Sequence, residues 1–254
     1  MQVIEKQLIV LEAIAELKNE NGFSVADLVE KTGFNSSAVH RICSVLVKRG
    51  YLFHKHKRSK YLISQKFLLF SGINKYALGI KELALPFLER LCKETSETVD
   101  LLIFDGTSLF SMATILPKQF LQAVPDIASV QPFPLHGTAI GKMLLASLSD
   151  EKYNKVVADM ALTANTENTI QDREKLRAEI EVIRRENIAY DIEEFFTGIM
   201  SVAAPIKNDS SEIIGAISIV GPSIRIDRSK LKQFAPVARS YALQISRSLG
   251  YKGK

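Results

Sequence analysis

The segment between Ser24 and Gly50 contains two short apolar periodicities separated by a glycine, and this spacing restricts what the segment can fold into. Ser24 can cap a short helix that runs to Lys31, and Gly33 then breaks that helix. Ser36 can cap a second helix, which Gly50 ends as the residue after its C-cap. Two short helices joined by a glycine turn are typical of a helix-turn-helix, whose second helix lies in the DNA major groove.

Apolar segments on both sides complete this pattern. Upstream, apolar residues recur at helical spacing and predict an amphipathic helix that ends near Gly22, with the stripe Ile4, Leu8, Leu11 and Ala15. Downstream, 51–53 and 61–63 are apolar and flank a cationic stretch at 54–60. Two short apolar strands joined by such a loop predict a β-hairpin, the wing of a winged helix-turn-helix.

The distribution of charge supports a polyanionic partner for this part of the chain alone. Residues 1–81 hold 13 Lys and Arg against 6 Asp and Glu, whereas residues 82–254 hold 20 against 22. Between Lys31 and Lys81 there are 11 cationic residues and no acidic residue at all. Such an asymmetry indicates a nucleic acid or an anionic membrane as the partner of the first third, and a solvated basic surface is the ordinary alternative.

The polar face of the second helix, expected to reach about Arg49, predicts how DNA would be read. Residues spaced by three or four lie on one face and reach base edges and phosphates together. The candidates on this face are Ser37, His40, Arg41, Ser44 and Lys48. Ser36 and the first-turn amides add a phosphate site at the helix N-terminus. The wing cations are expected to contact the phosphate backbone, and they are Lys55, Lys57, Arg58 and Lys60.

Several other kinds of protein are disfavoured by the residue inventory. Two cysteines and four histidines make neither a disulfide framework nor a zinc-finger spacing, and Cys43 falls on the apolar side of its helix. His54 and His56 would offer a metal only two ligands, so no metal and no cofactor are expected. Charged residues interrupt the N-terminal apolar stretch, which predicts a soluble cytoplasmic protein without a membrane segment.

The order of these motifs resembles the IclR-type bacterial transcriptional regulators. In the first third the resemblance rests on Ser24-Val-Ala-Asp-Leu-Val-Glu-Lys-Thr-Gly33, Ser37-Ala-Val-His-Arg-Ile42 and Leu46-Val-Lys-Arg-Gly-Tyr-Leu52. It continues with Glu94-Thr-Ser-Glu-Thr-Val99, Pro134-Leu-His-Gly-Thr-Ala-Ile-Gly-Lys142, Tyr190-Asp-Ile-Glu-Glu194, Ala203-Ala-Pro-Ile206 and Ile217-Ser-Ile-Val-Gly-Pro222. The similarity spans about residues 8–250 and implies a regulator with a separate effector domain.

The remaining two thirds of the chain are expected to form an α+β domain. Periodicity predicts helices at 82–95, 138–147, 151–161, 171–186 and 227–249, and strands at 98–104, 108–115, 188–192, 201–207 and 213–220. Segregated strands and helices favour a sheet covered by helices. With the resemblance, the expected organisation is a winged helix-turn-helix at 1–63, a helical linker at 64–81 and a GAF-like effector-binding domain at 82–254.

The segment from His136 to Lys142 places small residues where the chain enters a helix, which leaves first-turn amides open to a carboxylate. It is not a phosphate-binding loop, because the spacing is one residue short and Met143 replaces the required Ser or Thr. The resemblance implies that an effector pocket forms where this segment meets an aspartate and two strands. The residues so implicated are Thr138, Ala139, Asp191, Ser201 and Ser218.

Two positions depart from the family's pattern. Ser201 stands where the family commonly has Cys, and Met200 stands where a basic residue is frequent. The hydroxyl of Ser201 still donates a hydrogen bond to a ligand oxygen, so a polar pocket is retained. An ionised Asp191 would repel a carboxylate unless it met a ligand hydroxyl or amine, or were itself protonated. The alternative for Asp191 is a turn-capping role.

The leading hypothesis is a ligand-responsive transcriptional regulator, repressor or activator of a metabolic operon, with a small organic acid as effector. It would bind double-stranded DNA at a pseudo-palindromic operator as a homodimer or tetramer. The rival hypothesis is an enzyme in the second domain, with candidates His136, Asp191, Glu193 and Glu194. No nucleophile elbow, metal dyad or dinucleotide fingerprint accompanies them, so no catalytic residue is assigned. A third hypothesis is a non-specific nucleic-acid binder.

Overall fold

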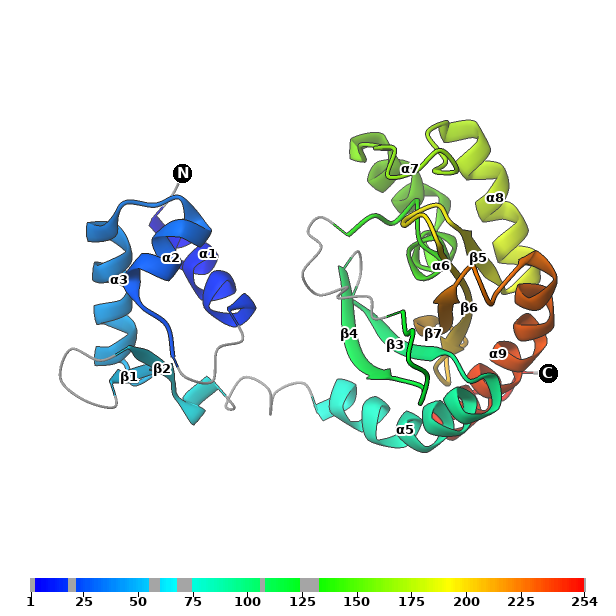
Figure 1. Ribbon diagram of the computed structural model, residues 1–254, viewed down its shortest axis with the longest axis horizontal. Coiled ribbons are helices and arrows are strands. Elements are labelled where there is room, and N and C mark those ends of the chain that lie inside the picture. Colours follow the sequence, from blue (N-terminus) through cyan, green and yellow to red (C-terminus); the bar gives the residue numbers. More distant parts are fainter. Residues whose placement is uncertain are drawn as a thin grey trace. The chain divides into compact units, whose positions relative to one another are not determined.

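The computed structural model describes residues 3–17, 22–54, 60–67, 75–105, 108–123 and 133–253. The chain divides into two compact units, Met1–Lys75 and Tyr76–Lys254 (Figure 1). The first unit contains α1 (Val3–Glu16), α2 (Val25–Thr32), α3 (Ser36–Lys48), β1 (Leu52–His54), β2 (Tyr61–Ile63) and the 3-10 turn η1 (Gln65–Phe67). The second contains α5 (Lys75–Thr95), β3 (Thr98–Asp105), β4 (Ser108–Ile115), α6 (Ala139–Ser147), α7 (Asp150–Asp159), α8 (Arg173–Glu186), β5 (Ala189–Ile192), β6 (Ile199–Lys207), β7 (Ile213–Pro222) and α9 (Arg228–Ser248).

Local capping explains why the first unit forms its helices where it does. Ser24 and Asp27 make a reciprocal capping box, in which the Asp27 amide donates to Ser24 Oγ over 3.2 Å and the Ser24 amide donates to Asp27 Oδ2 over 2.8 Å. Gly33 and Gly50 follow the two helices with φ of +70° and +77°, as the sequence predicts. These glycines provide the left-handed turns that separate α2, α3 and the hairpin.

One predicted cap is wrong. Asn35, rather than Ser36, is the N-cap of α3, and its side chain accepts a hydrogen bond from the Ala38 amide over 2.8 Å. Asn caps a helix about as well as Ser does, so capping propensity does not favour Ser36 over its neighbour. The backbone of Asn35 is extended, and Ser36 is already the first helical residue with an exposed side chain.

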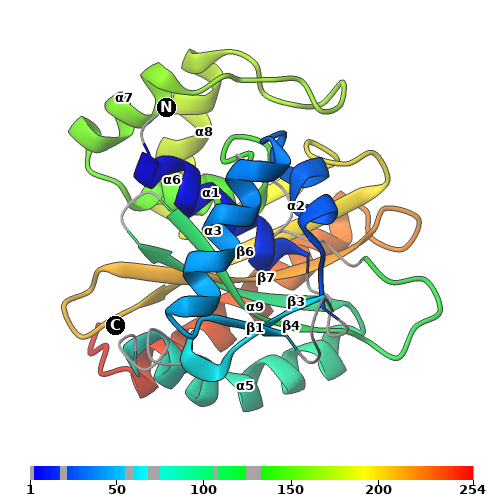
Figure 2. The same cartoon turned by 90° about the vertical axis from the view of Figure 1, so that its left-hand side faces the viewer.

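The helices α1, α2 and α3 of the first unit (Figure 2) and the strands of its hairpin all contribute residues to one core. Its buried residues are Val10, Ala13, Ile14, Phe23, Leu28, Val39, Cys43, Leu52 and Tyr61. The hairpin β1–β2 is antiparallel, and Phe23 extends it because its backbone exchanges hydrogen bonds of 3.0 and 2.8 Å with Tyr61. Burial raises the pKa of the Cys43 thiol to about 11, so this thiol stays protonated and packs as a small apolar group.

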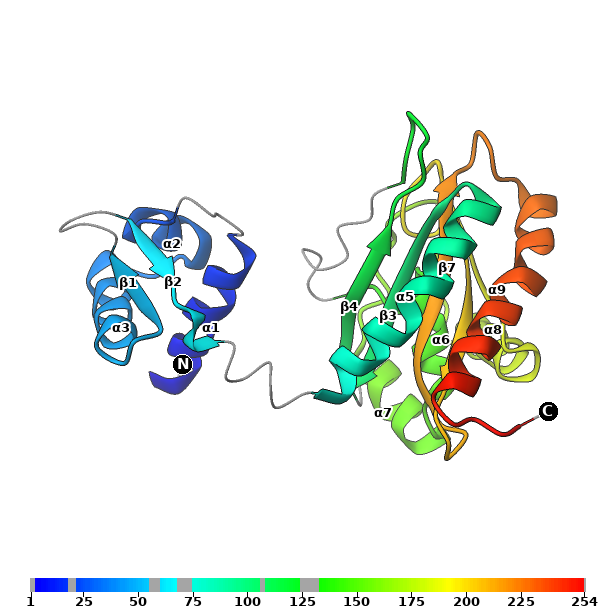
Figure 3. The ribbon, with the colours of Figure 1, turned by 90° about the horizontal axis from the view of Figure 1, so that it is seen from below.

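The second unit is built on a five-stranded antiparallel sheet of order β4-β3-β7-β6-β5. One face packs against α5 and α9 through buried residues such as Leu88, Val202 and Leu231 (Figure 3). The other face packs against α6, α7 and α8 through residues such as Leu145 and Ala203. This architecture confirms the predicted combination of a helix-turn-helix with an α+β domain.

The boundary between the units falls inside the segment expected to be a linker. Residues 65–67 form η1, and α5 begins at Lys75, so the last part of 64–81 belongs to the first helix of the second unit. Residues 68–74 lie outside the described part of the chain. Ile80 of α5 is buried against Ile103 of β3, which ties the start of this helix to the sheet.

Candidate functional site

The polar face predicted for α3 is exposed along its whole length. The exposed residues on this face are Ser36, Ser37, His40, Arg41, Ser44 and Lys48, whereas Val39 and Cys43 on the opposite side are fully buried. The Ser44 hydroxyl donates to the carbonyl oxygen of His40 over 2.8 Å, so its proton is engaged with its own helix. The lone pairs of this oxygen stay available to accept hydrogen bonds.

Val45 adds an apolar side chain to this face, with half of its surface exposed. It lies four residues after Arg41 and three before Lys48, in the middle of the polar row. The helical periodicity places Val45 outside the buried apolar stripe. It was missed in the sequence because only polar residues were considered as DNA contacts. An exposed apolar group at this position suits contact with the methyl group of thymine.

The wing is described only in part. Lys55, Lys57 and Arg58 lie outside the described residues, whereas Lys60 is described and exposed. The turn η1, which follows the hairpin, is joined to the end of α3, because Lys66 Nζ donates to the Arg49 carbonyl oxygen over 2.6 Å. The hairpin β1–β2 comes directly after α3 in the chain, which is the order that a winged helix-turn-helix requires.

A small cavity of about 50 Å³ lies between the start of α6 and the sheet face that α6 covers. Its lining includes all five residues expected to bind an effector, namely Thr138, Ala139, Asp191, Ser201 and Ser218. It also includes Asp100, Phe133, Ile140, Phe195, Phe196, Ile199 and Val220. The cavity is thus a mainly apolar space into which a few polar groups point.

Strand register explains how these polar residues meet. Ser201 of β6 lies opposite Asp191 of β5 and opposite Val220 of β7. Ser218 of β7, two residues from Val220, lies opposite Asp100 of β3. Residues that pair across strands share a face, as do residues two apart on one strand. The polar side chains therefore form two adjacent rows on a single face of the sheet.

The start of α6 supplies backbone amides to the same cavity. Thr138 is the N-cap, and its Oγ1 accepts a hydrogen bond from the Gly141 amide over 3.0 Å. The amides of Ala139 and Ile140 precede the first intrahelical hydrogen bond, so the helix itself leaves them available. A Cβ on Gly141 would lie 2.5 Å from the Leu135 carbonyl oxygen, so only glycine lets the preceding turn close over the helix start.

Two buried carboxyl groups line the cavity. Asp191 is 4% exposed, its Oδ1 accepts the Glu194 amide over 2.8 Å, and burial raises its pKa to about 7. Asp100 is fully buried, its Oδ1 accepts the Thr114 hydroxyl over 2.6 Å, and burial raises its pKa to about 6. Asp100 Oδ2 has no hydrogen-bond partner among the residues that the structure describes.

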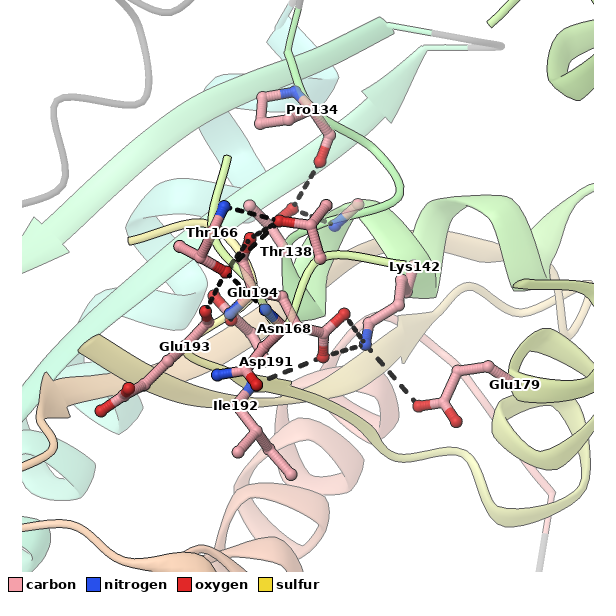
Figure 4. A network of polar contacts seen from close by, with 12 residues as sticks. Pro134, Thr138, Lys142, Thr166, Asn168, Glu179, Asp191, Ile192, Glu193 and Glu194 are labelled. Carbon is pink, nitrogen blue, oxygen red and sulfur yellow. Dashed lines mark hydrogen bonds and ion pairs between the residues drawn. The ribbon is translucent and has the colours of Figure 1, made fainter. Parts of the chain in front are cut away.

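A buried ion pair joins α6 to the turn between β5 and β6 (Figure 4). Lys142 of α6 is 1% exposed, and its Nζ lies 2.6 and 2.8 Å from the two carboxylate oxygens of Glu194. Glu179 of α8 approaches the same Nζ to 3.6 Å. Glu194 lies in the turn between β5 and β6, and the hydroxyls of Thr166 and Thr169 each donate to carbonyl oxygens of that turn. The turn that carries Phe195 and Phe196 is therefore fixed to α6.

Comparison with known proteins decides the family. Residues 76–247 match the family model described as the bacterial transcriptional regulator IclR C-terminal domain. The chain belongs to the IclR family. Residues 2–59 match the model of the MarR family, whose match covers the helix-turn-helix and ends before β2. The family identifies the chain as an HTH-type transcriptional regulator, which confirms the leading hypothesis at that level.

Individual relatives agree with this assignment. An HTH-type transcriptional regulator of Mycobacterium tuberculosis is 35% identical over 204 residues, which cover 80% of this chain and 76% of the relative. The crystal structure of Thermotoga maritima IclR is 27% identical with a TM-score of 0.72 and covers 98% of each chain. The inducer-binding domain of Acinetobacter PobR, a double mutant in complex with 3-hydroxybenzoic acid, is 26% identical with a TM-score of 0.59; the match covers 65% of this chain and 96% of that one.

The residues considered for an enzyme do not converge in this IclR-family chain. His136 is buried with its Nε2 3.0 Å from the Thr163 carbonyl oxygen, and Glu194 is engaged by Lys142. Of the four candidates His136, Asp191, Glu193 and Glu194, Asp191 alone is among the described residues that line the cavity. A larger groove of about 540 Å³, which includes Lys152 and Arg184, contains none of the predicted site residues. No helix in the described ranges is long and apolar enough to span a membrane.

The buried carboxyl groups predict an unusual dependence of stability on pH. An aspartate has a pKa of about 3.9 in an unfolded chain, so the folded state binds the Asp191 proton more tightly and loses stability as pH rises from about 4 to about 7. Asp191→Asn keeps an oxygen for the Glu194 amide but has no proton to lose, so its stability does not fall over this range. We expect the melting temperature of the variant, relative to that of the wild type, to rise between about pH 5 and pH 8.

The matched control is Asp209→Asn, because Asp209 is exposed on a turn of the same unit. Its melting temperature should follow that of the wild type at every pH. Thermal unfolding monitored by circular dichroism measures both variants. A constant difference between Asp191→Asn and the wild type over this range would show that the Asp191 carboxyl is not the titrating group.

Proposed function

We propose that α3 is the recognition helix of this regulator and lies in the major groove of double-stranded DNA. The exposed row on α3 carries the proposal, because it presents donors, acceptors and one apolar group on a single face. Arg41 is suited to bidentate contact with guanine, and the start of α3 with Ser36 and Ser37 is suited to a phosphate. His40, Ser44 and Lys48 extend the contact along the groove. Lys55, Lys57, Arg58 and Lys60 of the wing would contact phosphates and add affinity without selecting a sequence.

We propose further that the regulator acts as a homodimer or as a tetramer built from dimers. One recognition helix contacts too few base pairs to select a site in a genome, whereas two related by a two-fold axis read a pseudo-palindrome. Half-sites about 34 Å apart place both helices on the same side of the duplex. A regulator that works on chromosomal DNA acts in the cytoplasm.

The second unit, on this proposal, binds a small organic acid and catalyses nothing. The observation that carries this is the cavity itself, which is lined by the start of α6 and by Ser201 and Ser218. These groups donate hydrogen bonds to a carboxylate, and a helix N-terminus favours negative charge. The PobR domain with 3-hydroxybenzoic acid supports an acid effector in this family.

Effector binding would change the shape of this cavity. Ligand pockets usually measure about 300 Å³ or more, whereas this cavity measures about 50 Å³. An organic acid therefore has to widen it, and the side chains of Phe195 and Phe196 on the β5–β6 turn are the groups placed to move. Affinity that differs between the narrow and wide forms is what couples an effector to DNA binding.

Asp191→Ala tests the effector proposal. We expect operator binding without effector to remain within about twofold of wild type, because the substitution lies in the second unit. The response of operator affinity to an acid that acts on the wild type should be lost, since the Glu194 amide loses its acceptor and the pocket loses a polar wall. Fluorescence anisotropy of labelled operator DNA, titrated with and without acid, measures both quantities. An unaltered response would remove Asp191 from the effector site.

A further inference from the structure

We propose that Asp100 selects effectors that carry a hydrogen-bond donor, a hydroxyl or an ammonium group, in addition to their carboxylate. This inference rests on the proposed acid-binding role of the cavity and deepens it by naming the chemical class of the acid. The residues implicated by family resemblance do not include Asp100, and it comes from the structure alone.

The position of Asp100 places it among the groups that would surround an effector. It lines the same cavity as Thr138 and Ala139 at the start of α6, and it pairs across strands with Ser218. It is fully buried, so its carboxyl group is shielded from bulk solvent. Its neighbours on β3 are the buried apolar residues Val99 and Leu101, which belong to the core on the opposite face.

One of the two carboxyl oxygens of Asp100 has no hydrogen bond among the described residues. Oδ1 accepts the Thr114 hydroxyl over 2.6 Å, and this contact fixes the orientation of the carboxyl. Oδ2 is buried and has no partner in the described part of the chain. A buried acceptor without a donor destabilises a folded protein, so a ligand that brings a donor to Oδ2 gains that free energy on binding.

A ligand that carries only a carboxylate brings no hydrogen-bond donor to Asp100. The amides of α6 and the hydroxyls of Ser201 and Ser218 are donors that suit the carboxylate of an effector. Asp100 and Asp191 are acceptors when ionised, and they repel a ligand that brings only negative charge. A hydroxy acid or an amino acid satisfies both sets of groups at once, because its donor meets a carboxylate of the protein.

Pairs of acids that differ only in the donor test this inference on the full-length protein. The probes are lactate against propionate and 3-hydroxybenzoate against benzoate for the hydroxyl, and alanine against propionate for the ammonium group. Isothermal titration calorimetry gives each dissociation constant, and thermal shift confirms binding. We expect the donor-bearing member of at least one pair to bind about 10- to 100-fold more tightly, the range of a hydrogen bond to a charged group.

Asp100→Asn then assigns the selectivity to one residue. The amide keeps the size of the side chain and an oxygen for Thr114 but presents a donor where Oδ2 was. The donor-bearing acid should lose at least tenfold in affinity, whereas the plain acid of the pair should bind as before or more tightly. General damage to the fold would weaken both acids alike. Glu97→Gln is the matched control, because Glu97 is also buried but is held by Arg225 and does not line the cavity.

Each remaining outcome has a definite meaning. If no acid binds the wild-type protein, the acid-binding function and the selectivity of Asp100 both fail. If the members of every pair bind equally, or the plain acids bind more tightly, the acid site stands and the inference about Asp100 is wrong. It is also wrong if Asp100→Asn retains the preference for the donor-bearing acid.

Discussion

Lys142→Met is expected to lower the free energy of unfolding of the second unit by about 3 to 5 kcal/mol. The substitution removes a cation that is 1% exposed and lies within 2.8 Å of both carboxylate oxygens of Glu194. An unpaired buried carboxylate destabilises the fold by more than the ion pair stabilised it. Glu179 cannot replace Lys142, because it is also acidic. Urea denaturation followed by circular dichroism measures the loss, since the chain contains no Trp for fluorescence.

The double variant Lys142→Met with Glu194→Leu separates the loss of the pair from a loss of packing. Replacing both partners with apolar residues leaves no unpaired charge, so we expect it to recover most of the stability. The loss in the single variant should also shrink at low pH, where Glu194 takes up a proton. A single variant that loses less than about 1 kcal/mol, or a double variant that is no more stable than the single one, would contradict the role assigned to this pair.

Simultaneous replacement of Lys55, Lys57 and Arg58 with Ala is expected to weaken binding to every duplex and to flatten its dependence on salt. Each lost phosphate contact removes about 0.9 from the slope of log K against log salt, so three contacts remove about 2.7. Arg41→Ala should act differently and cost about 1 to 3 kcal/mol at one base position while leaving the preference at other positions intact. Anisotropy titrations against matched and singly altered duplexes over a range of salt measure both effects.

Lys232→Ala is the control for these substitutions, because Lys232 is an exposed cation on α9 in the other unit. It should change neither the affinity nor the slope. If Arg41→Ala and the wing variant weaken all duplexes in the same way, the division of labour between α3 and the wing is wrong. The chain would then behave as the non-specific nucleic-acid binder that the sequence left open as an alternative.

Signals that depend on neighbouring residues made α2, α3 and the hairpin predictable. The stripe predicted for α1 is wrong, because Ile4 and Leu8 are exposed and Val10, Ala13 and Ile14 are buried instead. The capping pair Ser24 and Asp27, the glycine turns and the apolar stripe of α3 each act within a few residues, and all appear in the structure. The error at the start of α3 is of the same kind, since Asn35 and Ser36 are adjacent residues that both cap helices well. Propensity alone does not choose between them, and in the structure Asn35 takes the extended backbone of an N-cap.

The effector cavity depends on contacts that no short window of sequence contains. Resemblance to the family named Asp191 and Ser201, and strand register shows why they meet. Asp100 was missed although an acidic residue within an apolar strand is itself a signal, because burying a carboxylate is costly unless it has a function. Lys142 and Glu194 are 52 residues apart, so their pairing becomes visible only once α6 and the β5–β6 turn are in place.

Repeated selection of random DNA duplexes by the full-length protein, at about 0.15 M salt, tests whether this chain is a ligand-responsive regulator that reads DNA. We expect enrichment of one sequence with two-fold symmetry and half-sites about 34 Å apart, whose occupancy changes when a binding organic acid is added. A library that stays unenriched both with and without the acids would contradict a ligand-responsive regulator that reads DNA through α3.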